Sequence, residues 1–479
     1  MQILMLSSTF PYPPSRGGTQ VRTFNLLKYL SQRHHVILGT LRSPDVTDAQ
    51  IDELRQQVGE LAVFPHPQIP PQPPLAKGGL RLDPEPDGNF LLPLNKGEDF
   101  LLPPLSKGED FLLPPLSKGE DFLPPPLNKG RTEGGFSEII GKFHRFSRFL
   151  QSGTPPNVLS RYSPAMQHWV DQLVAAGKCD AITCEHSVNE IYVRPEWRQN
   201  ILTVVNIHSS VWGTCKQMLE TGTSENPLRD RLNLPLLARY EKRYCAKFSR
   251  IVVTTSTDKQ QLLELLSSRE NPKEIEYSSM QTIEVLPNGV DLIEFPDRAI
   301  DPGGYTLIFA GAMNNLPNID AARFLSLEIL PIVQQQYPDT TLTLVGTSPV
   351  PEILALAKQP GIQVLGRVQK VAEYLHQATV CVVPMRIGFG IKNKTLEAMA
   401  AGTPVVASDR GLEGLAIGGG PQPIRALRAN RIQEYVEAIS SLFENPHLRQ
   451  ELSRNARSHI ENQYTWNTIG RRYDQLLQF

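Results

Sequence analysis

Several features that would define other classes of protein are missing from this sequence. Its five cysteines form no Cys-x-x-Cys pair, so neither a disulfide framework nor a zinc site is expected. No apolar run reaches about 18 residues, so no transmembrane helix is expected. The 48 basic and 49 acidic residues give a formal net charge of -1, and this balance argues against a nucleic-acid binder.

Common signatures of targeting and catalysis are also absent. The opening segment, MQILMLSSTF, has no basic region and no long apolar core, so a signal peptide is not expected and a cytoplasmic location fits. The sequence contains no Gly-x-Ser-x-Gly or His-Glu-x-x-His motif, no Gly-x-Gly-x-x-Gly after a strand, and no Asp-x-Asp suited to a divalent metal. These absences disfavour a serine hydrolase, a zinc protease and a nicotinamide dehydrogenase, and they predict no metal site.

Proline, by contrast, is concentrated in one stretch. Sixteen of the 41 prolines lie between Pro65 and Pro126, and in the same stretch the segment Lys96–Phe100 recurs twice with an eleven-residue period. Because proline neither continues a helix nor serves a central strand, residues 66–135 are predicted to be a disordered or polyproline-like insertion. A docking motif displayed several times is the functional alternative.

Outside that insertion, short apolar segments alternate with helical patterns. Such alternation is typical of parallel sheets that are covered by helices on both faces. The number of predicted strands favours two stacked units over one large sheet, with a boundary at the turn Asn288–Asp291. The predicted strands are Ile3–Leu6, His35–Leu41, Ala181–Cys184, Ile201–Ile207 and Ile251–Thr254 in the first unit, and Leu307–Ala310, Thr341–Val345, Gln363–Leu365, Val380–Val383 and Val405–Ala407 in the second.

The most informative segment runs from Pro384 to Val406. It reads as a strand, a glycine loop, a short helix and a second strand. Gly388 and Gly390 allow the backbone to approach a ligand closely. The helix that begins near Lys394 points free N–H groups and the positive end of its dipole at the loop.

Charged side chains in the same segment complete the predicted site. Arg386, Lys392 and Lys394 supply positive charge, so the segment is predicted to form a diphosphate cradle that needs no metal. Glu397 lies one helical turn after Lys394, and its carboxylate could accept two hydrogen bonds from a ribose diol. The alternative is a tight strand-to-helix turn with ordinary surface lysines.

This segment resembles the nucleotide-sugar site of retaining glycosyltransferase family 4, which has the GT-B fold. Its Gly390–Lys394 variant is similar to a sub-branch that includes sugar transferases of exosortase-associated exopolysaccharide clusters. The resemblance covers nearly everything except residues 66–135. The other segments that carry it are the glycine loop Pro13–Gly18, the linker Leu286–Asp291, Phe309–Gly311, Leu316–Asp320, the strand ends at Gly346, Gly366 and Pro384, and Tyr464–Trp466.

The resemblance implies an α/β protein with two Rossmann-like doubly wound domains that face each other across a cleft. Residues 1–65 and 136–290 would form the acceptor-side domain. Residues 291–460 would form the nucleotide-sugar-binding domain, and residues 461–479 would form a helix that crosses back to the first domain.

The resemblance also assigns roles to single residues. Catalytic roles fall to His208, whose imidazole would meet the donor sugar, and to Glu397. Glu185 and His186, which follow another predicted strand, could face the acceptor. A structural histidine and a plain glycine turn are the alternatives for His208 and for the first glycine loop. The donor would be bound by Gly17, Gly18, Gly311, Arg386, Gly388, Gly390, Lys392, Lys394 and Glu397.

Two departures from the family pattern concern the donor. Many relatives carry a glutamate that contacts the donor sugar where this chain has Phe389. The cations that usually follow the first strand of the second domain are missing from Gly311–Asn315. These departures affect the expected contacts to the sugar more than those to the nucleotide.

The sequence therefore predicts a metal-independent retaining glycosyltransferase that uses a nucleoside-diphosphate sugar, with UDP or GDP as the nucleotide. The acceptor would be a glycan, a polysaccharide or a lipid-linked glycan, and a lipid-linked acceptor would bring the protein to the inner face of the membrane. No separate cofactor and no nucleic-acid partner are expected. Two alternatives stay open, namely a nucleotide-sugar epimerase of the same fold and a non-catalytic nucleotide-sugar-binding protein.

Overall fold

The structure is a computed structural model that describes residues 1–14, 17–67, 149–224, 226–267, 281–388 and 390–478. All described residues belong to one compact unit. From residue 68 onward, the predicted insertion at residues 66–135 lies outside the described residues. Phe389, which departs from the family pattern, lies outside them as well.

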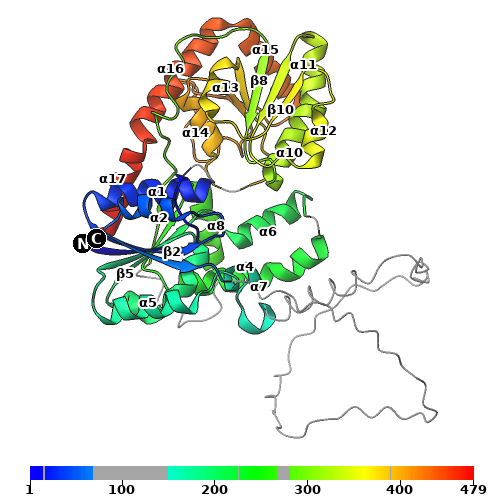
Figure 1. Cartoon of the computed structure of the whole chain (residues 1–479). Helices are drawn as coiled ribbons and strands as arrows, with labels where there is room; N and C mark the ends of the chain where they lie inside the picture. Colours follow the sequence, from blue (N-terminus) through cyan, green and yellow to red (C-terminus); the bar gives the residue numbers. More distant parts are fainter. Residues whose placement is uncertain (15–16, 68–148, 225, 268–280, 389, 479) are drawn as a thin grey trace, which may run out of the picture. The chain divides into compact units, whose positions relative to one another are not determined.

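The first sheet contains seven parallel strands (Figure 1). Their order is β3-β2-β1-β4-β5-β6-β7, which is a doubly wound arrangement. The prediction of a parallel α/β sheet is therefore confirmed for the first half of the chain. The strands are β1 (Gln2–Ser7), β2 (His35–Arg42), β3 (Glu60–Pro65), β4 (Ala181–Glu185), β5 (Leu202–Ile207), β6 (Arg250–Val253) and β7 (Thr282–Val285).

Both faces of this sheet are buried under helices. Alternate residues of β1 point to opposite faces, with Ile3 and Met5 in one apolar cluster and Leu4 and Leu6 in the other. The first cluster includes side chains from α1 (Gly18–Ser31), α2 (Asp48–Arg55) and α17 (Trp466–Leu477), and the second includes side chains from α5 (Pro164–Ala175), α7 (Pro227–Cys245) and α8 (Ser256–Ser267). The shorter helices α4 (Pro156–Leu159) and α6 (Val211–Glu220) belong to the same half of the chain.

The second sheet contains six parallel strands in the order β10-β9-β8-β11-β12-β13, which is again doubly wound. Its strands are β8 (Thr306–Ala310), β9 (Thr341–Val345), β10 (Ile362–Leu365), β11 (Val380–Val383), β12 (Val405–Ala407) and β13 (Leu427–Arg428). The helices of this half are α10 (Leu316–Phe324), α11 (Leu330–Gln336), α12 (Pro351–Leu356), α13 (Val371–Gln377), α14 (Asn393–Ala400), α15 (Ile432–Glu444) and α16 (Pro446–Gln463).

The last helix, α17, packs against the first sheet rather than the second (Figure 1). Trp466 and Tyr473 of α17 belong to the apolar cluster that α1 also covers. The approach to α1 is close, because a Cβ on Gly470 would lie 2.3 Å from the ring of Tyr29. Trp466 packs over Gly289 in the linker, where a Cβ would lie 2.7 Å from the indole. The chain therefore returns to its first half after completing the second.

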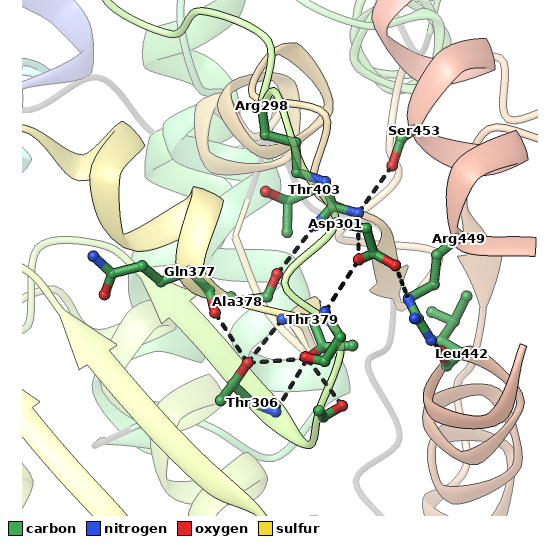
Figure 2. A network of polar contacts seen from close by, with 12 residues as sticks. Arg298, Asp301, Thr306, Gln377, Ala378, Thr379, Thr403, Leu442, Arg449 and Ser453 are labelled. Carbon is green, nitrogen blue, oxygen red and sulfur yellow. Dashed lines mark hydrogen bonds and ion pairs between the residues drawn. The ribbon is translucent and has the colours of Figure 1, made fainter. Parts of the chain in front are cut away.

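A polar network fixes the segment that leads into the second sheet (Figure 2). Arg298 pairs with Asp301 at 3.2 Å and donates to Ser453 Oγ at 3.3 Å. Asp301 also accepts a hydrogen bond from Arg449 Nε at 2.8 Å, and Arg449 and Ser453 both lie on α16. Thr306, the first residue of β8, extends the network at the amino-terminal edge of the sheet (Figure 2). The network therefore holds the segment around Arg298 and Asp301 against α16, at the amino-terminal ends of the strands.

The repeat insertion is expected to be dispensable for folding. Replacing residues 68–134 with a short Gly/Ser linker should leave the melting temperature nearly unchanged, because each doubling of loop length costs only about 0.6 kcal/mol. Thermal unfolding of the shortened chain beside the full chain checks this. Loss of soluble protein would contradict the prediction, because it would show that the segment packs against the core.

Candidate functional site

The reversal of strand order marks where each sheet can bind a ligand. It falls between β1 and β4 in the first sheet and between β8 and β11 in the second. Ligands of doubly wound sheets bind outside the carboxyl ends of the strands at such points. The predicted site residues follow these or neighbouring strands, with Gly17 and Gly18 after β1, His186 after β4, His208 after β5, Gly311 after β8, and Gly388 and Gly390 after β11.

The glycine loop after β11 approaches the carboxyl edge of the first sheet. Gly390 has a φ of +70°, and a Cβ there would lie 2.6 Å from Thr254 Oγ1 and 3.2 Å from the carbonyl oxygen of His208. The next residue, Ile391, donates its backbone N–H to Thr254 Oγ1 at 3.4 Å. Any side chain at position 390 would therefore combine backbone strain with a steric clash. The two sheets thus place their strand-end loops against each other.

Lys392 lies in this loop, but it does not extend as a free cation. The sequence predicts that Lys392 faces phosphate, whereas its Nζ donates to the carbonyls of Gly388 and Gly390 and pairs with Glu413 at 3.3 Å. Its side chain is 8% exposed, and burial lowers the pKa of Lys392 to about 8 although the Glu413 charge raises it. A buried ammonium persists only when it is paired and hydrogen-bonded. The contacts of Lys392 to the loop carbonyls and to Glu413 meet this need, and they stabilise the conformation of the loop.

Arg386 is also engaged elsewhere. Its guanidinium makes a two-pronged pair with Asp320 and lies 4.6 Å from the ring centroid of Phe324. It lines a pocket of about 480 Å³ together with Asp409 and Tyr435. The prediction that the three cations Arg386, Lys392 and Lys394 face one diphosphate stays a prediction. Arg386 and Lys392 already pair with acidic residues that are distant in the sequence, Arg386 with Asp320 and Lys392 with Glu413.

Lys394 occupies the point where the second sheet reverses its strand order. Its Nζ lies 2.8 Å from the position of a Cβ on Gly311, donates to Asn318 Oδ1, and sits 4.5 Å from the ring centroid of Phe309. Burial lowers the pKa of Lys394 to about 7, and Lys392 contributes in the same direction. An anion at this point would restore the charged form of Lys394.

Glu397 follows Lys394 by one turn on the same face of α14. Within the described part of the chain, no hydrogen-bond donor contacts its carboxylate. Burial raises the pKa of Glu397 to about 7, and Glu294 raises it further while Lys394 lowers it. The carboxylate is thus partly buried and available to a ligand that carries hydroxyl donors.

His208 and His186 lie side by side at the carboxyl ends of β5 and β4. Their ring centroids are 5.2 Å apart in an edge-to-face arrangement. His208 Nδ1 lies 3.3 Å from Thr19 Oγ1 in the first turn of α1. Burial, and secondarily His186 and Arg22, hold the pKa of His208 well below its usual range, so its imidazole is neutral at pH 7.

The second ring nitrogen of His208 is the clearest unsatisfied group of the site. Among the described residues, its Nε2 is buried and has no hydrogen-bond partner. Buried polar atoms in native proteins nearly always have a partner, so this nitrogen is available to accept a hydrogen bond from a ligand or to donate one to it. The predicted meeting of His208 and a bound sugar stays a prediction.

Glu185 does not belong to the exposed part of this site. It is 0% exposed, and its Oε1 accepts hydrogen bonds from Asn206 Nδ2 at 3.1 Å and from the Tyr473 hydroxyl at 3.0 Å. Burial raises the pKa of Glu185 to about 7, although the Arg22 charge lowers it. The expectation that Glu185 faces an acceptor is therefore wrong, because its carboxylate has no access to solvent.

Sequence reasoning missed two asparagines at the site. Asn318 accepts from Lys394 and donates its own Nδ2 to the carbonyl of Ala312 at 2.9 Å. Asn393 is the first residue of α14 and accepts from Asn288 Nδ2 at 2.8 Å. Neither could be found from spacing alone, because asparagine near a helix start is ordinarily explained by local backbone preference.

Comparison with known proteins identifies the class to which this arrangement corresponds. Residues 304–445, which contain all six strands of the second sheet, match the family "Glycosyl transferases group 1". The second half of the chain thus carries a glycosyl transferase group 1 domain. Together with the two doubly wound sheets, this gives the fold of GT-B glycosyltransferases.

Curated relatives match parts of the chain. Glycogen synthase of Mycobacterium tuberculosis is 26% identical over 197 residues, which cover 39% of this chain and 46% of that protein. Phosphatidyl-myo-inositol mannosyltransferase of the same organism is 34% identical over 132 residues, which cover 26% of this chain and 34% of that protein. The match therefore spans about half of the relative's length or less in each case.

Solved structures match the whole chain in fold. HepE from Anabaena, crystallised with UDP and glucose, covers 100% of this chain and 99% of its own, with a TM-score of 0.56 and 13% identity. A glycosyltransferase from Rickettsia africae covers 100% of this chain and 97% of its own, with a TM-score of 0.52 and 12% identity. At these identities the likeness is one of fold. None of the helices in the described residues is long and apolar enough to cross a bilayer.

Proposed function

We propose that the protein is a retaining glycosyltransferase of family 4 that transfers a sugar from a UDP-sugar to a glycan, a polysaccharide or a lipid-linked acceptor. The observation that carries the proposal is the buried, unpartnered Nε2 of His208, which lies in the loop that Gly390 of the second half approaches. UDP is favoured over GDP because HepE, which shares the fold, was crystallised with UDP. The acceptor class follows from the resemblance of Gly390–Lys394 to exopolysaccharide sugar transferases.

The chemistry proposed for the site is positioning and electrostatic stabilisation. Lys394 and the free N–H groups at the start of α14 would bind the diphosphate, and Glu397 would accept from the ribose hydroxyls. His208 would hold the sugar from the other side. In a retaining transfer the acceptor approaches the face that the diphosphate leaves, and the leaving diphosphate takes the acceptor proton. The protein then lowers the barrier by stabilising the leaving charge.

We also propose that this reaction needs no divalent metal, because Lys394 and the helix dipole supply positive charge at the predicted diphosphate position. Transfer of labelled sugar from UDP-glucose, UDP-galactose and GDP-mannose to an acceptor panel should proceed in EDTA. NMR of the product should show the anomeric configuration of the donor. Loss of transfer in EDTA with recovery in manganese would refute metal independence, and inverted product would refute retention.

The same assay separates the alternatives. Conversion of a donor to a different nucleotide-sugar without acceptor would indicate an epimerase. A thermal-shift response to a nucleotide-sugar without turnover against any acceptor would indicate a binding protein. A ligand at about 100 times its Kd adds roughly 2.7 kcal/mol to stability, so binding of UDP would be readily seen. No response to any nucleotide-sugar would contradict the proposed function itself.

A further inference from the structure

The side-chain amide of Asn393 connects three segments that are far apart in the sequence. Its Oδ1 accepts a hydrogen bond from Asn288 Nδ2 at 2.8 Å, in the linker between the two sheets. Its Nδ2 lies 3.5 Å from the position of a Cβ on Gly18, in the glycine loop before α1. Within the described part of the chain, no acceptor contacts this Nδ2. The amide therefore presents its donor hydrogens to the space beside Gly18.

The orientation of this amide follows from Arg22. Arg22 is 1% exposed, and its Nη1 donates to Asn288 at 2.8 Å and to the carbonyl of Pro287 at 3.1 Å. A guanidinium only donates, so the Asn288 atom that faces it must be oxygen. The Asn288 atom that faces Asn393 must then be nitrogen. Consequently the Asn393 oxygen faces Asn288, and its NH₂ group faces the other way.

The position of that NH₂ group suits an anion. Asn393 begins α14, whose first backbone N–H groups have no partner within the helix. Lys394 is the next residue, and burial has already lowered its pKa to about 7. A neutral amide adds a hydrogen-bond donor here without burying a further charge. Gly18 leaves the space beside the amide open, because a Cβ there would already lie at contact distance, 3.5 Å, from Nδ2.

We propose that Asn393 Nδ2 donates a hydrogen bond to the diphosphate of the bound nucleotide, and that Arg22 and Asn288 are positioning residues that orient the amide. This inference rests on the function proposed above and adds a residue to its donor site. The donor is aligned before the ligand arrives, so it can stabilise the charge that develops on the leaving diphosphate.

A simpler role for Asn393 is to tie the linker to α14, and substitutions at Asn393 separate the two roles. Asn393→Asp keeps an oxygen that accepts from Asn288 but replaces the free NH₂ group with a second oxygen. Asn393→Ala removes the donor without adding charge, and alanine favours the helix more than asparagine does. We expect UDP affinity to fall more than tenfold in the first variant and about fivefold to tenfold in the second.

A substitution at Asn288 tests the orientation itself. In Asn288→Asp the carboxylate still accepts from Arg22 but has no N–H for Asn393. The Asn393 amide should then rotate so that its NH₂ group donates to Asp at position 288 and its oxygen faces the ligand. UDP affinity should fall several-fold although residue 288 does not touch the nucleotide. If the hydrogen bond served only as a tie, it would persist in this variant and UDP affinity would not change.

Calorimetric titration of the full chain with UDP and with uridine provides the measurement. The loss in all three variants should be large for UDP and small for uridine, because only the diphosphate contact is affected. Asn467→Asp is the control, since it makes the same charge change at an exposed position on α17. Melting temperatures of the free variants within a few degrees of the wild type show that they fold.

The outcomes distinguish this inference from the proposed function. If the wild type binds neither UDP nor GDP, the proposed function is overturned and the inference with it. If the wild type binds UDP and both Asn393 variants bind it within twofold, the inference alone is overturned. Equal losses for uridine and UDP would also overturn it, because they would place the defect away from the diphosphate.

Discussion

Replacing His208 with alanine should lower the turnover of sugar transfer by about 100-fold or more and leave UDP affinity nearly unchanged. The imidazole follows β5 of the first sheet, whereas Lys394 and Glu397 lie on α14 of the second half. Removing one preorganised group that acts on the transition state typically costs about 100-fold to 1000-fold in turnover. The nucleotide contacts proposed for α14 do not involve the imidazole, so UDP binding should persist.

Steady-state transfer kinetics and UDP titration of the same variant check this split. His447→Ala is a suitable control, because His447 is exposed in the first turn of α16. If His208→Ala weakened UDP binding as much as a Lys394 substitution does, the assignment of His208 to the sugar would be wrong. If the variant kept full turnover, the junction of the two halves would not be the active site.

The pH profile adds a second check on His208. Its pKa is held well below the usual range by burial, and the pKa of His186 is lowered to about 4 for the same reason. Both rings are therefore neutral above about pH 6 in the free protein. We therefore expect that titration of His208 adds no inflection near pH 6.5 to the turnover of the wild type. The pH profiles of the wild type and of His208→Ala should have the same shape in this range. Such an inflection would mean that the imidazole is more exposed during catalysis than in the free protein.

All central strands and the edge strand β10 could be predicted from sequence, and the other three edge strands could not. Short β-branched runs revealed β1, β2, β4, β5 and β6 in the first sheet and β8 to β12 in the second. The missed strands β3, β7 and β13 each lie at an edge of a sheet. An edge strand pairs on one side only and needs fewer apolar residues, and β13 has only two residues. The apolar pattern is therefore weakest where burial is least.

The site was predictable in its backbone and less so in its charges. Gly390 and α14 stand out because a glycine loop directly before a helix allows close approach to a ligand or to other backbone. The partner of Lys392 could not be predicted, because Glu413 is 21 residues further along the chain and reaches it only through the fold. Asp320 likewise pairs with Arg386, although the two residues are 66 positions apart in the sequence. Spacing reveals which cations are near a loop but not which of them are already paired.

Lys394 is the predicted cation that the fold leaves beside Gly311, and Lys394→Met should weaken UDP binding strongly. A charge-assisted hydrogen bond contributes about 1.5 to 3 kcal/mol, which corresponds to a loss of about tenfold to more than 100-fold. Methionine fits the apolar contacts to Phe309 and Met385, so the fold should be retained. Lys358→Met is the matched control, because Lys358 is exposed and precedes β10, at the amino-terminal ends of the strands and away from the proposed site.

The same substitution should change the pH dependence of UDP binding. The pKa of Lys394 in the free protein is about 7, and a bound diphosphate raises it by stabilising the ammonium. Binding therefore takes up a proton, so the contribution of Lys394 to affinity is complete below pH 7 and declines as pH rises above it. The Lys394 charge also lowers the pKa of Glu397, which titrates near 7, so wild type and Lys394→Met are compared in a Glu397→Gln background. The phosphates of UDP titrate in both proteins, so the remaining difference isolates Lys394. Calorimetry between pH 6 and 9 should show the affinity ratio of the two proteins shrinking as pH rises. A ratio that stays constant across this range would show that Lys394 remains charged throughout and that burial does not control its titration.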